Sequence, residues 1–415
     1  ASASPTGAPP AARARFAASL DALAHGLVER GVEARLLLLA ALAGEHVLFV
    51  GPPGTAKSEL ARRLAGLVDG GPYFERLLTR FSVPEELFGP LSMRALEDDR
   101  YVRQTEGYLP AARVAFIDEV FKVGEGCGGG GRRVAGARRA LPPADTPLPP
   151  LPLQASSAIL NALLTLLNER LFDNGAAREP VPLVCLVGAS NELPESEELD
   201  ALYDRFLLRR EVAQVSPEGL NQLLRASTVS DASAPPRAPL TAADLVAARS
   251  GASSVAVPDD VLALLADLRD WLQTACEPPV YVSDRRLVKS LRLLRVAAWA
   301  DGRSTVDRRD ALLLQHVLWQ RPGEATRVGD RLLAALADDA GGAQAGFLFG
   351  GMFGRACIGA SSRPASLPDV AADVGALREV LESRLASLQA AAAAARGGGG
   401  GGSAAPSSLW LDPAQ

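Results

Sequence analysis

The sequence predicts an α/β domain followed by an all-helical region, and three observations support this. Two apolar segments have the character of buried strands: His46–Val50 runs into a Gly-rich turn, and Arg113–Ile117 runs into two carboxylates. Helical periodicity marks residues 15–42, with a break at Gly31. Beyond residue 216 the pattern is helical, with Pro, Gly and Ser clusters between segments at 217–227, 241–250, 258–276, 284–300 and 306–320.

The turn after the first strand has the composition of a phosphate-binding loop. Such a loop requires a strand, a Gly-rich turn and a helix, because the N–H groups of the turn and of the helix N-terminus converge on an anion. The lysine would reach the β- and γ-phosphates of a nucleotide, and the serine hydroxyl would ligate Mg²⁺. The alternative is a strand-to-helix turn that is Gly-rich by chance. The loop residues are Gly51, Pro52, Pro53, Gly54, Thr55, Ala56, Lys57 and Ser58.

The loop departs from the common pattern at Ala56, where a glycine usually precedes the lysine. Alanine keeps the backbone N–H, so we expect phosphate contact to be retained if the φ angle of Ala56 is negative.

Two further strand ends carry polar groups suited to nucleotide hydrolysis. Asp118 ends the second apolar strand and would hold Mg²⁺, and Glu119 would polarise an attacking water. Asn191 follows the apolar strand 183–188 and suits a residue that orients this water. A solvated loop is the alternative for the acidic pair, which is a weak signal on its own and a strong one downstream of a phosphate loop.

Composition limits the other functions. The chain has 415 residues, 48% hydrophobic and 22% charged, as in ordinary globular proteins. A net charge of −5 gives no electrostatic case for nucleic acid binding. The four scattered cysteines indicate reduced thiols without a zinc site, and no apolar run is long enough to span a bilayer.

Several segments are expected to lie outside the folded core. Residues 1–14 are predicted to be a disordered tail, and the Ala/Ser/Arg-rich first 20 residues would also suit the remnant of an organelle transit peptide. Residues 124–155 are rich in Gly and Pro and are predicted to be a disordered insertion. Residues 323–415 are expected to be a poorly defined helical C-terminal region with a Gly-rich linker at 397–402.

The motifs, in this order, resemble the MoxR branch of AAA+ ATPases, and within it the RavA (regulatory ATPase variant A) subgroup. The resemblance covers about residues 15–321 apart from the insertion, and Ala56 is itself usual in this branch. The stretches that carry it are Gly44–Leu48 with the phosphate loop, Leu78–Ser92, Gly107–Pro110, Phe116–Lys122, Ile159–Gly175, Gly188–Pro194, Leu202–Arg205, Val282–Arg286 and Trp299–Trp319.

The resemblance implies a P-loop NTPase with an αβα core at 15–215 and a C-terminal all-helical lid at 216–322. It implies ATP and Mg²⁺ at subunit interfaces of a homo-oligomer, usually a hexamer. By motif match, Asn191 is the sensor 1 residue, Arg205 the arginine finger and Arg285 the sensor 2 arginine, with Arg286 as the nearest competitor for the last role.

The resulting interpretation is a ring-forming ATPase that acts as a chaperone-like remodelling or regulatory factor, with a von Willebrand factor A-type protein as implied partner. The alternatives are a magnesium-chelatase-like motor subunit, a nucleotide-dependent scaffold without turnover and a nucleic-acid motor. Intact Glu119 and Arg205 argue against the scaffold, and the acidic charge balance argues against the nucleic-acid motor. The expected location is the cytoplasm or an organelle stroma or matrix.

Overall fold

A computed structural model describes residues 7–69, 71–122, 153–194, 196–228 and 240–339. The chain divides into two compact units, of which the first contains residues 1–325 and the second residues 326–408. All of the architecture below belongs to the first unit. Of the second, the structure describes only the continuation of helix α12 (Glu324–Asp339).

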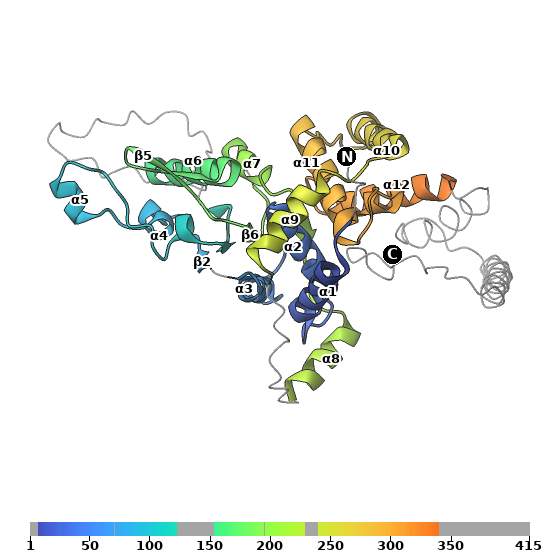
Figure 1. The fold of residues 1–415 in the computed structure, drawn as a ribbon, viewed down its shortest axis with the longest axis horizontal. Helices are drawn as coiled ribbons and strands as arrows, with labels where there is room; N and C mark the ends of the chain where they lie inside the picture. The colour runs from blue at the N-terminus through green and yellow to red at the C-terminus, as the bar shows by residue number, and fades with distance from the viewer. Residues whose placement is uncertain (1–6, 70, 123–152, 195, 229–239, 340–415) are drawn as a thin grey trace, which may run out of the picture. The chain divides into compact units, whose positions relative to one another are not determined.

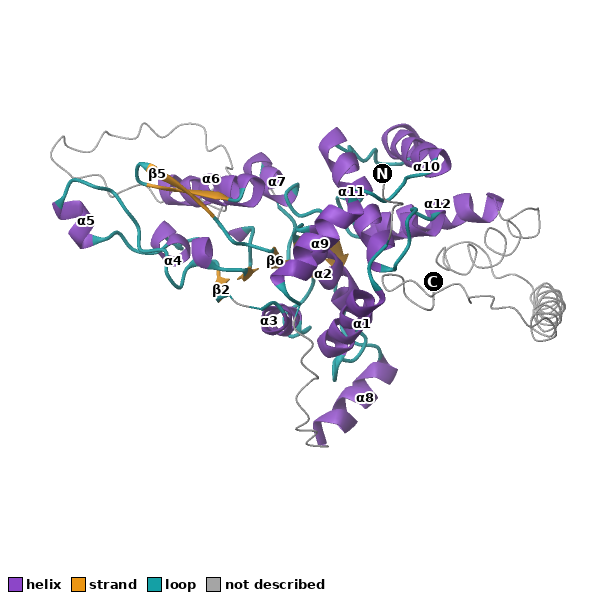
Figure 2. Ribbon diagram, viewed as in Figure 1, coloured by secondary structure: helices purple, strands orange, loops and turns teal. Residues whose placement is uncertain are grey.

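The centre of the first unit is a parallel five-stranded sheet with the strand order β2-β3-β6-β1-β7. Figure 2 shows strands β2 and β6 among the surrounding helices. The sheet confirms the predicted α/β class, because short apolar runs buried on both faces are typical of parallel strands between helices. The strands are β1 (Val47–Val50), β2 (Tyr73–Leu77), β3 (Val114–Asp118), β6 (Cys185–Ser190) and β7 (Leu208–Glu211).

Helices cover both faces of the sheet. Alternate side chains of the central strands, such as Leu48 and Ile117, join a buried apolar cluster with Leu163 of α6 (Leu153–Glu169). On the other face, α2 (Gly31–Ala43) contacts β1 and β7, and α3 (Lys57–Leu67) contacts β3. Helix α7 (Glu197–Tyr203) packs on α6.

A small extension follows β2. It contains α4 (Pro84–Phe88), α5 (Met93–Glu97) and the short turn η1 (Leu109–Ala111). The hairpin of β4 (Leu171–Asn174) and β5 (Ala177–Pro180) lies on the same side of the first unit as α4 and α5 (Figure 1). The Asn174 side chain joins the two, since it accepts a hydrogen bond from the Arg103 N–H at 2.7 Å and donates to the Arg103 carbonyl at 3.2 Å. Gly175 and Ala176 form the two-residue turn of this hairpin, with Gly175 at φ 65°.

The second half of the unit is helical, as predicted. It contains α8 (Pro217–Thr228), α9 (Ala242–Ala252), α10 (Asp259–Asp270) with its π-helical extension η3 (Trp271–Ala275), α11 (Asp284–Ala300) and the 3₁₀ segment η4 (Arg308–His316). Helix α11 packs on both α9 and α2. Because α2 also contacts β1 and β7, it connects the helical region to the sheet.

The expected disordered tail at 1–14 is wrong for residues 7–14. Helix α1 spans Pro10–Ala24, and the Ala8 N–H donates to the Trp299 carbonyl at 2.8 Å. The Phe16 and Trp299 rings also pack with centroids 6.2 Å apart. Nothing in the local sequence indicates this order, because it depends on contacts with a helix almost 300 residues away. The predicted insertion at 124–155 lies outside the described residues apart from its last three positions, which begin α6.

Candidate nucleotide site

The phosphate loop lies between β1 and α3, as the sequence predicts. The loop folds around its own lysine: Lys57 Nζ donates to the carbonyls of Gly51 at 2.8 Å and Pro52 at 2.7 Å. The Thr55 hydroxyl closes the turn with a 3.0 Å bond to the Pro52 carbonyl. Gly51 is required by the packing, since a Cβ at this position would collide with the Val212 carbonyl oxygen.

Ala56 differs from the expectation. Its φ angle is 65°, in the left-handed region, rather than negative. An L-residue pays roughly 1–2 kcal/mol in this conformation. The loop therefore has the backbone conformation that glycine would adopt at this position, and alanine retains the backbone N–H there.

A cavity of about 120 Å³ brings together Glu119 and Asn191 with Lys57 of the phosphate loop. Ser58 and Asp118 supply hydroxyl and carboxylate oxygens at its wall, which are the donor types that Mg²⁺ prefers. No group of three or more His, Cys, Asp and Glu side chains that could hold a metal ion occurs among the described residues. The lining residues are Pro53, Gly54, Thr55, Ala56, Lys57, Ser58, Phe116, Asp118, Glu119 and Asn191.

Glu119 is held in a strained and partly unsatisfied state. Its φ angle is 53°, which is uncommon outside glycine and is frequent at functional sites. Asn191 Nδ2 donates to Glu119 Oε1 at 2.8 Å, and Lys122 Nζ lies 3.3 Å from the same oxygen. The other oxygen, Oε2, is buried and has no hydrogen-bond partner within the described part of the chain. An acceptor in this state at the wall of a cavity fits a group that polarises water.

The charges around Lys57 oppose one another. Partial burial lowers the pKa of Lys57, whereas the nearby carboxylates of Asp118 and Glu119 raise it and the guanidinium of Arg30 lowers it. The bound phosphates of a nucleotide would give the Lys57 ammonium group anionic partners for charge-assisted hydrogen bonds.

Sequence reasoning missed Arg30, which supports the loop from behind. It is buried, and its guanidinium donates to the Thr55 carbonyl at 3.1 Å and to the Ala213 carbonyl at 2.7 Å. Arg30 thereby connects the phosphate loop to the segment after β7. Its only local signal is a charged residue directly before the helix break at Gly31, which is too common to indicate a role.

The two arginines assigned by resemblance lie elsewhere. Neither Arg205 nor Arg285 lines the cavity around Lys57. Arg205 forms an ion pair of 3.8 Å with Asp204, and Arg285 donates to Asn168 at 2.6 Å. Burial lowers the pKa of Arg205, and the positive charge of Arg285 lowers it further.

The structure separates Arg285 from its competitor Arg286. Arg285 is exposed at the start of α11, whereas Arg286 is 4% exposed. Arg286 donates to the carbonyls of Val317 at 2.8 Å and of Phe206 and Leu207 at 2.9 Å each. A guanidinium engaged with three carbonyls is not available to a nucleotide, so Arg286 is a packing residue.

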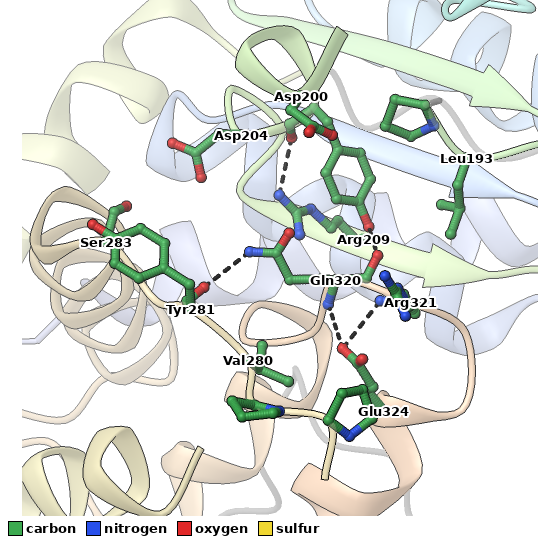
Figure 3. Close-up of a pocket in the computed structure, with 14 residues that line it drawn as sticks. Leu193, Asp200, Asp204, Arg209, Val280, Tyr281, Ser283, Gln320, Arg321 and Glu324 are labelled. Atoms are coloured by element: carbon green, nitrogen blue, oxygen red, sulfur yellow. Dashed lines mark hydrogen bonds between the residues drawn. The ribbon is translucent and has the colours of Figure 1, made fainter. Parts of the chain in front are cut away.

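A larger cavity, of about 570 Å³, lies between α7 and the helical region (Figure 3). Its wall includes Tyr203, Arg209, Tyr281, Gln320 and Glu324. Gln320 Nε2 donates to the Tyr281 carbonyl at 2.9 Å, and the Glu324 carboxylate accepts from the Gln320 N–H at 2.8 Å (Figure 3). None of the phosphate-loop residues takes part in this cavity.

The parallel sheet, the phosphate loop and the helical region define a nucleoside triphosphatase fold of the AAA+ class. The chain belongs to the MoxR family within this class. The profile of the MoxR domain in the MoxR-vWA-beta-propeller ternary systems matches residues 14–126 and 132–249, and an AAA lid domain profile matches residues 260–332. The first match is interrupted only at residues 127–131, so it also covers much of the segment predicted as an insertion.

Individual relatives agree with this assignment. Two uncharacterised proteins of Methanocaldococcus jannaschii are 38% and 37% identical to the chain over 294 and 306 residues, which are 70% and 72% of this chain and 67% and 70% of theirs. A structural protein of Acidianus two-tailed virus is 24% identical over 47% of this chain and 27% of its own. The crystal structure of a candidate ATPase from Cytophaga hutchinsonii superposes with a TM-score of 0.55 at 17% identity, over 77% of this chain and 91% of that one, which shows the fold. The described residues contain no helix that is long and apolar enough to cross a membrane.

Proposed function

We propose that the chain hydrolyses ATP, with Lys57 binding the phosphates and Glu119 polarising a water that Asn191 helps to orient. The observation that carries this is the Glu119 carboxylate, which has one oxygen fixed by Asn191 and the other buried without a partner at the wall of the phosphate cavity. Mg²⁺, when bound, would neutralise charge on the phosphates, and Ser58 and Asp118 are the residues that would hold it.

Two variants test the chemistry. Lys57→Ala should lose ATP binding, because the cation beside the phosphates is gone. Glu119→Gln should keep ATP binding and lose turnover by roughly 10²–10⁴-fold, because the amide cannot polarise water. ATP affinity by fluorescence titration and phosphate release measure the two effects. Wild-type turnover by Glu119→Gln would contradict the role of Glu119. ATP binding without turnover by the wild-type protein would instead favour the alternative of a scaffold that does not depend on hydrolysis.

The site is completed by a second copy of the chain in this proposal. Neither Arg205 nor Arg285 lines the phosphate cavity of its own chain, which supports a role at the nucleotide of a neighbouring subunit. A guanidinium carries a permanent charge that matches the charge developing on the γ-phosphoryl group. The copies would form a ring, for which a hexamer is the size expected from the resemblance.

Mixing separates this arrangement from a local role of Arg205. Arg205→Ala and Lys57→Ala proteins should each be inactive alone. Mixed oligomers should regain part of the ATPase activity, because an interface with both residues intact can form. If size-exclusion chromatography shows mixed oligomers in ATP and the mixture remains inactive, the assignment in trans is wrong.

The biological role in this proposal is remodelling or regulation of a protein partner. The MoxR domain that matches the chain is described from systems that also contain a vWA protein, which supports a partner of this type. A pull-down with Glu119→Gln in ATP, compared with Lys57→Ala, should enrich a protein that contains a vWA domain. Equal recovery by both variants would argue against ATP-dependent binding of this partner.

A further inference from the structure

Two buried arginines fasten the Arg205 segment to the helical region. Arg286 comes from α11 and donates to the carbonyls of Phe206 and Leu207, directly after Arg205. Its third contact with the segment is a 3.0 Å ion pair with Asp204, directly before Arg205. Both neighbours of the proposed arginine finger are therefore held by one side chain of the helical region.

Arg209, on strand β7 of the sheet, also connects the Arg205 segment to the helical region. It is 1% exposed and donates to the carbonyls of Tyr203 at 3.0 Å, Phe206 at 3.3 Å and Trp319 at 2.5 Å. Its guanidinium also lies 3.6 Å from the centre of the Tyr203 ring, within cation–π distance. The Tyr203 hydroxyl donates to the Gln320 carbonyl at 2.7 Å. Figure 3 shows Arg209 and Gln320 on the wall of the same cavity.

The carboxylate of Asp204 is divided between two arginines of different character. Oδ1 accepts the 3.0 Å bond from buried Arg286, and Oδ2 lies 3.8 Å from Arg205. Arg205 is 21% exposed, and its Nε is buried with no hydrogen-bond partner within the described part of the chain. The pair between Asp204 and Arg205 is therefore too long for a strong hydrogen bond, and it orients the guanidinium without occupying it.

We propose that Asp204 is a positioning residue, which transmits the placement of the helical region to Arg205 through its ion pair with Arg286. This inference rests on the proposed role of Arg205 at a neighbouring site. It adds a regulatory consequence: a shift of α11 relative to the sheet domain moves Arg205 toward or away from the neighbour's nucleotide. Neither Asp204 nor Arg286 lines the phosphate cavity of its own subunit, so we expect ATP binding to be independent of this ion pair.

The test compares Asp204→Ala with Asp200→Ala. Asp200 lies one helical turn earlier on α7 and has an exposed side chain, so its replacement removes the same charge without breaking the connection. Asp204→Ala should reduce ATPase activity by at least about tenfold, with ATP affinity unchanged. Asp200→Ala should retain wild-type activity. Asp204→Asn, which keeps an acceptor oxygen, should give an intermediate rate and guards against a folding defect in the alanine variant.

Rescue by mixing provides a readout that loss of stability alone would not give. Asp204→Ala mixed with Lys57→Ala should regain activity to the same extent as Arg205→Ala mixed with Lys57→Ala, because one kind of interface combines an intact Lys57 with a correctly placed Arg205. Wild-type activity of Asp204→Ala, or no rescue while the Arg205→Ala mixture is rescued, would overturn the positioning role. An inactive Arg205→Ala mixture in verified mixed oligomers would instead overturn the proposed trans site, and this inference with it.

Discussion

The side-chain amide of Asn191 donates a 2.8 Å hydrogen bond to the carboxylate of Glu119, a residue 72 positions earlier in the chain. The two residues follow adjacent parallel strands, β6 and β3, whose carboxyl ends meet at one edge of the sheet. The bond fixes one oxygen of Glu119, and the other oxygen is buried without a hydrogen-bond partner within the described part of the chain.

Asn191→Ala should therefore lower turnover and leave ATP affinity within about twofold. Loss of a positioned hydrogen-bond donor in an active site typically costs about 10²–10³ in kcat. Steady-state kinetics measure this, with Asn161→Ala on the exposed side of α6 as a matched control that should retain wild-type rates. If KM rises by the factor expected for the fall in kcat, and kcat itself is unchanged, Asn191 acts in substrate binding instead.

Arg30→Met should weaken ATP binding, because the buried guanidinium holds the loop through the Thr55 and Ala213 carbonyls. Each hydrogen bond to a charged group is worth about 1.5–3 kcal/mol, so we expect roughly a tenfold or larger rise in Kd. Isothermal titration with ATP measures it. Arg62→Met, which removes an exposed arginine from α3, is the control and should not change Kd by more than about twofold. Unchanged affinity in Arg30→Met would show that the loop is fixed without this contact.

Ala56→Gly should stabilise the protein by up to about 1 kcal/mol, because glycine adopts the positive φ of this position without a steric cost. Ala65→Gly within α3 should instead destabilise the protein, because glycine in a helix costs about 1 kcal/mol relative to alanine. Urea unfolding in the absence of nucleotide measures both. Destabilisation by Ala56→Gly similar to that by Ala65→Gly would mean that the left-handed conformation of Ala56 is not maintained in solution.

The stability of the fold should decrease as the pH falls below about 6.5, the pKa of an unfolded histidine. Burial lowers the pKa of His316 to about 3, and burial together with Arg170 and Lys289 lowers the pKa of His46 well below its usual value. Folded-state pKa values below the unfolded value mean that stability is fully present above pH 6.5. Each buried histidine then removes about 1.4 kcal/mol of unfolding free energy per pH unit below it.

His316→Gln should flatten this dependence between pH 6.5 and 5, above the range in which carboxylates titrate. Thermal unfolding at half-unit pH steps measures the slope. His25→Gln, which replaces an exposed histidine, should leave the slope of the wild-type protein unchanged. Parallel curves for the wild type and His316→Gln would show that His316 binds a proton as readily in the folded state as in the unfolded state.

The phosphate loop, its flanking strand and helix, the carboxylates of Asp118 and Glu119, and the helical second half were all determined by the sequence itself. These features are local: a strand, a turn or a helix face is written in consecutive or periodic residues, and parallel strands bring their polar ends to one edge whatever the details of packing. The pairing of Asn191 with Glu119 follows from this geometry once the strands are recognised.

Only the tertiary structure decided which of two adjacent arginines is buried. Arg285 and Arg286 are chemically identical in the sequence, and the rotation of α11 against the Asp204–Leu207 segment exposes the first and buries the second. The same holds for Arg30, whose partners are carbonyls 25 and 183 positions away, and for Ala8, which is ordered by Trp299. A backbone carbonyl carries no sequence signature, so a side chain that acts by binding carbonyls is visible only when the chain has folded.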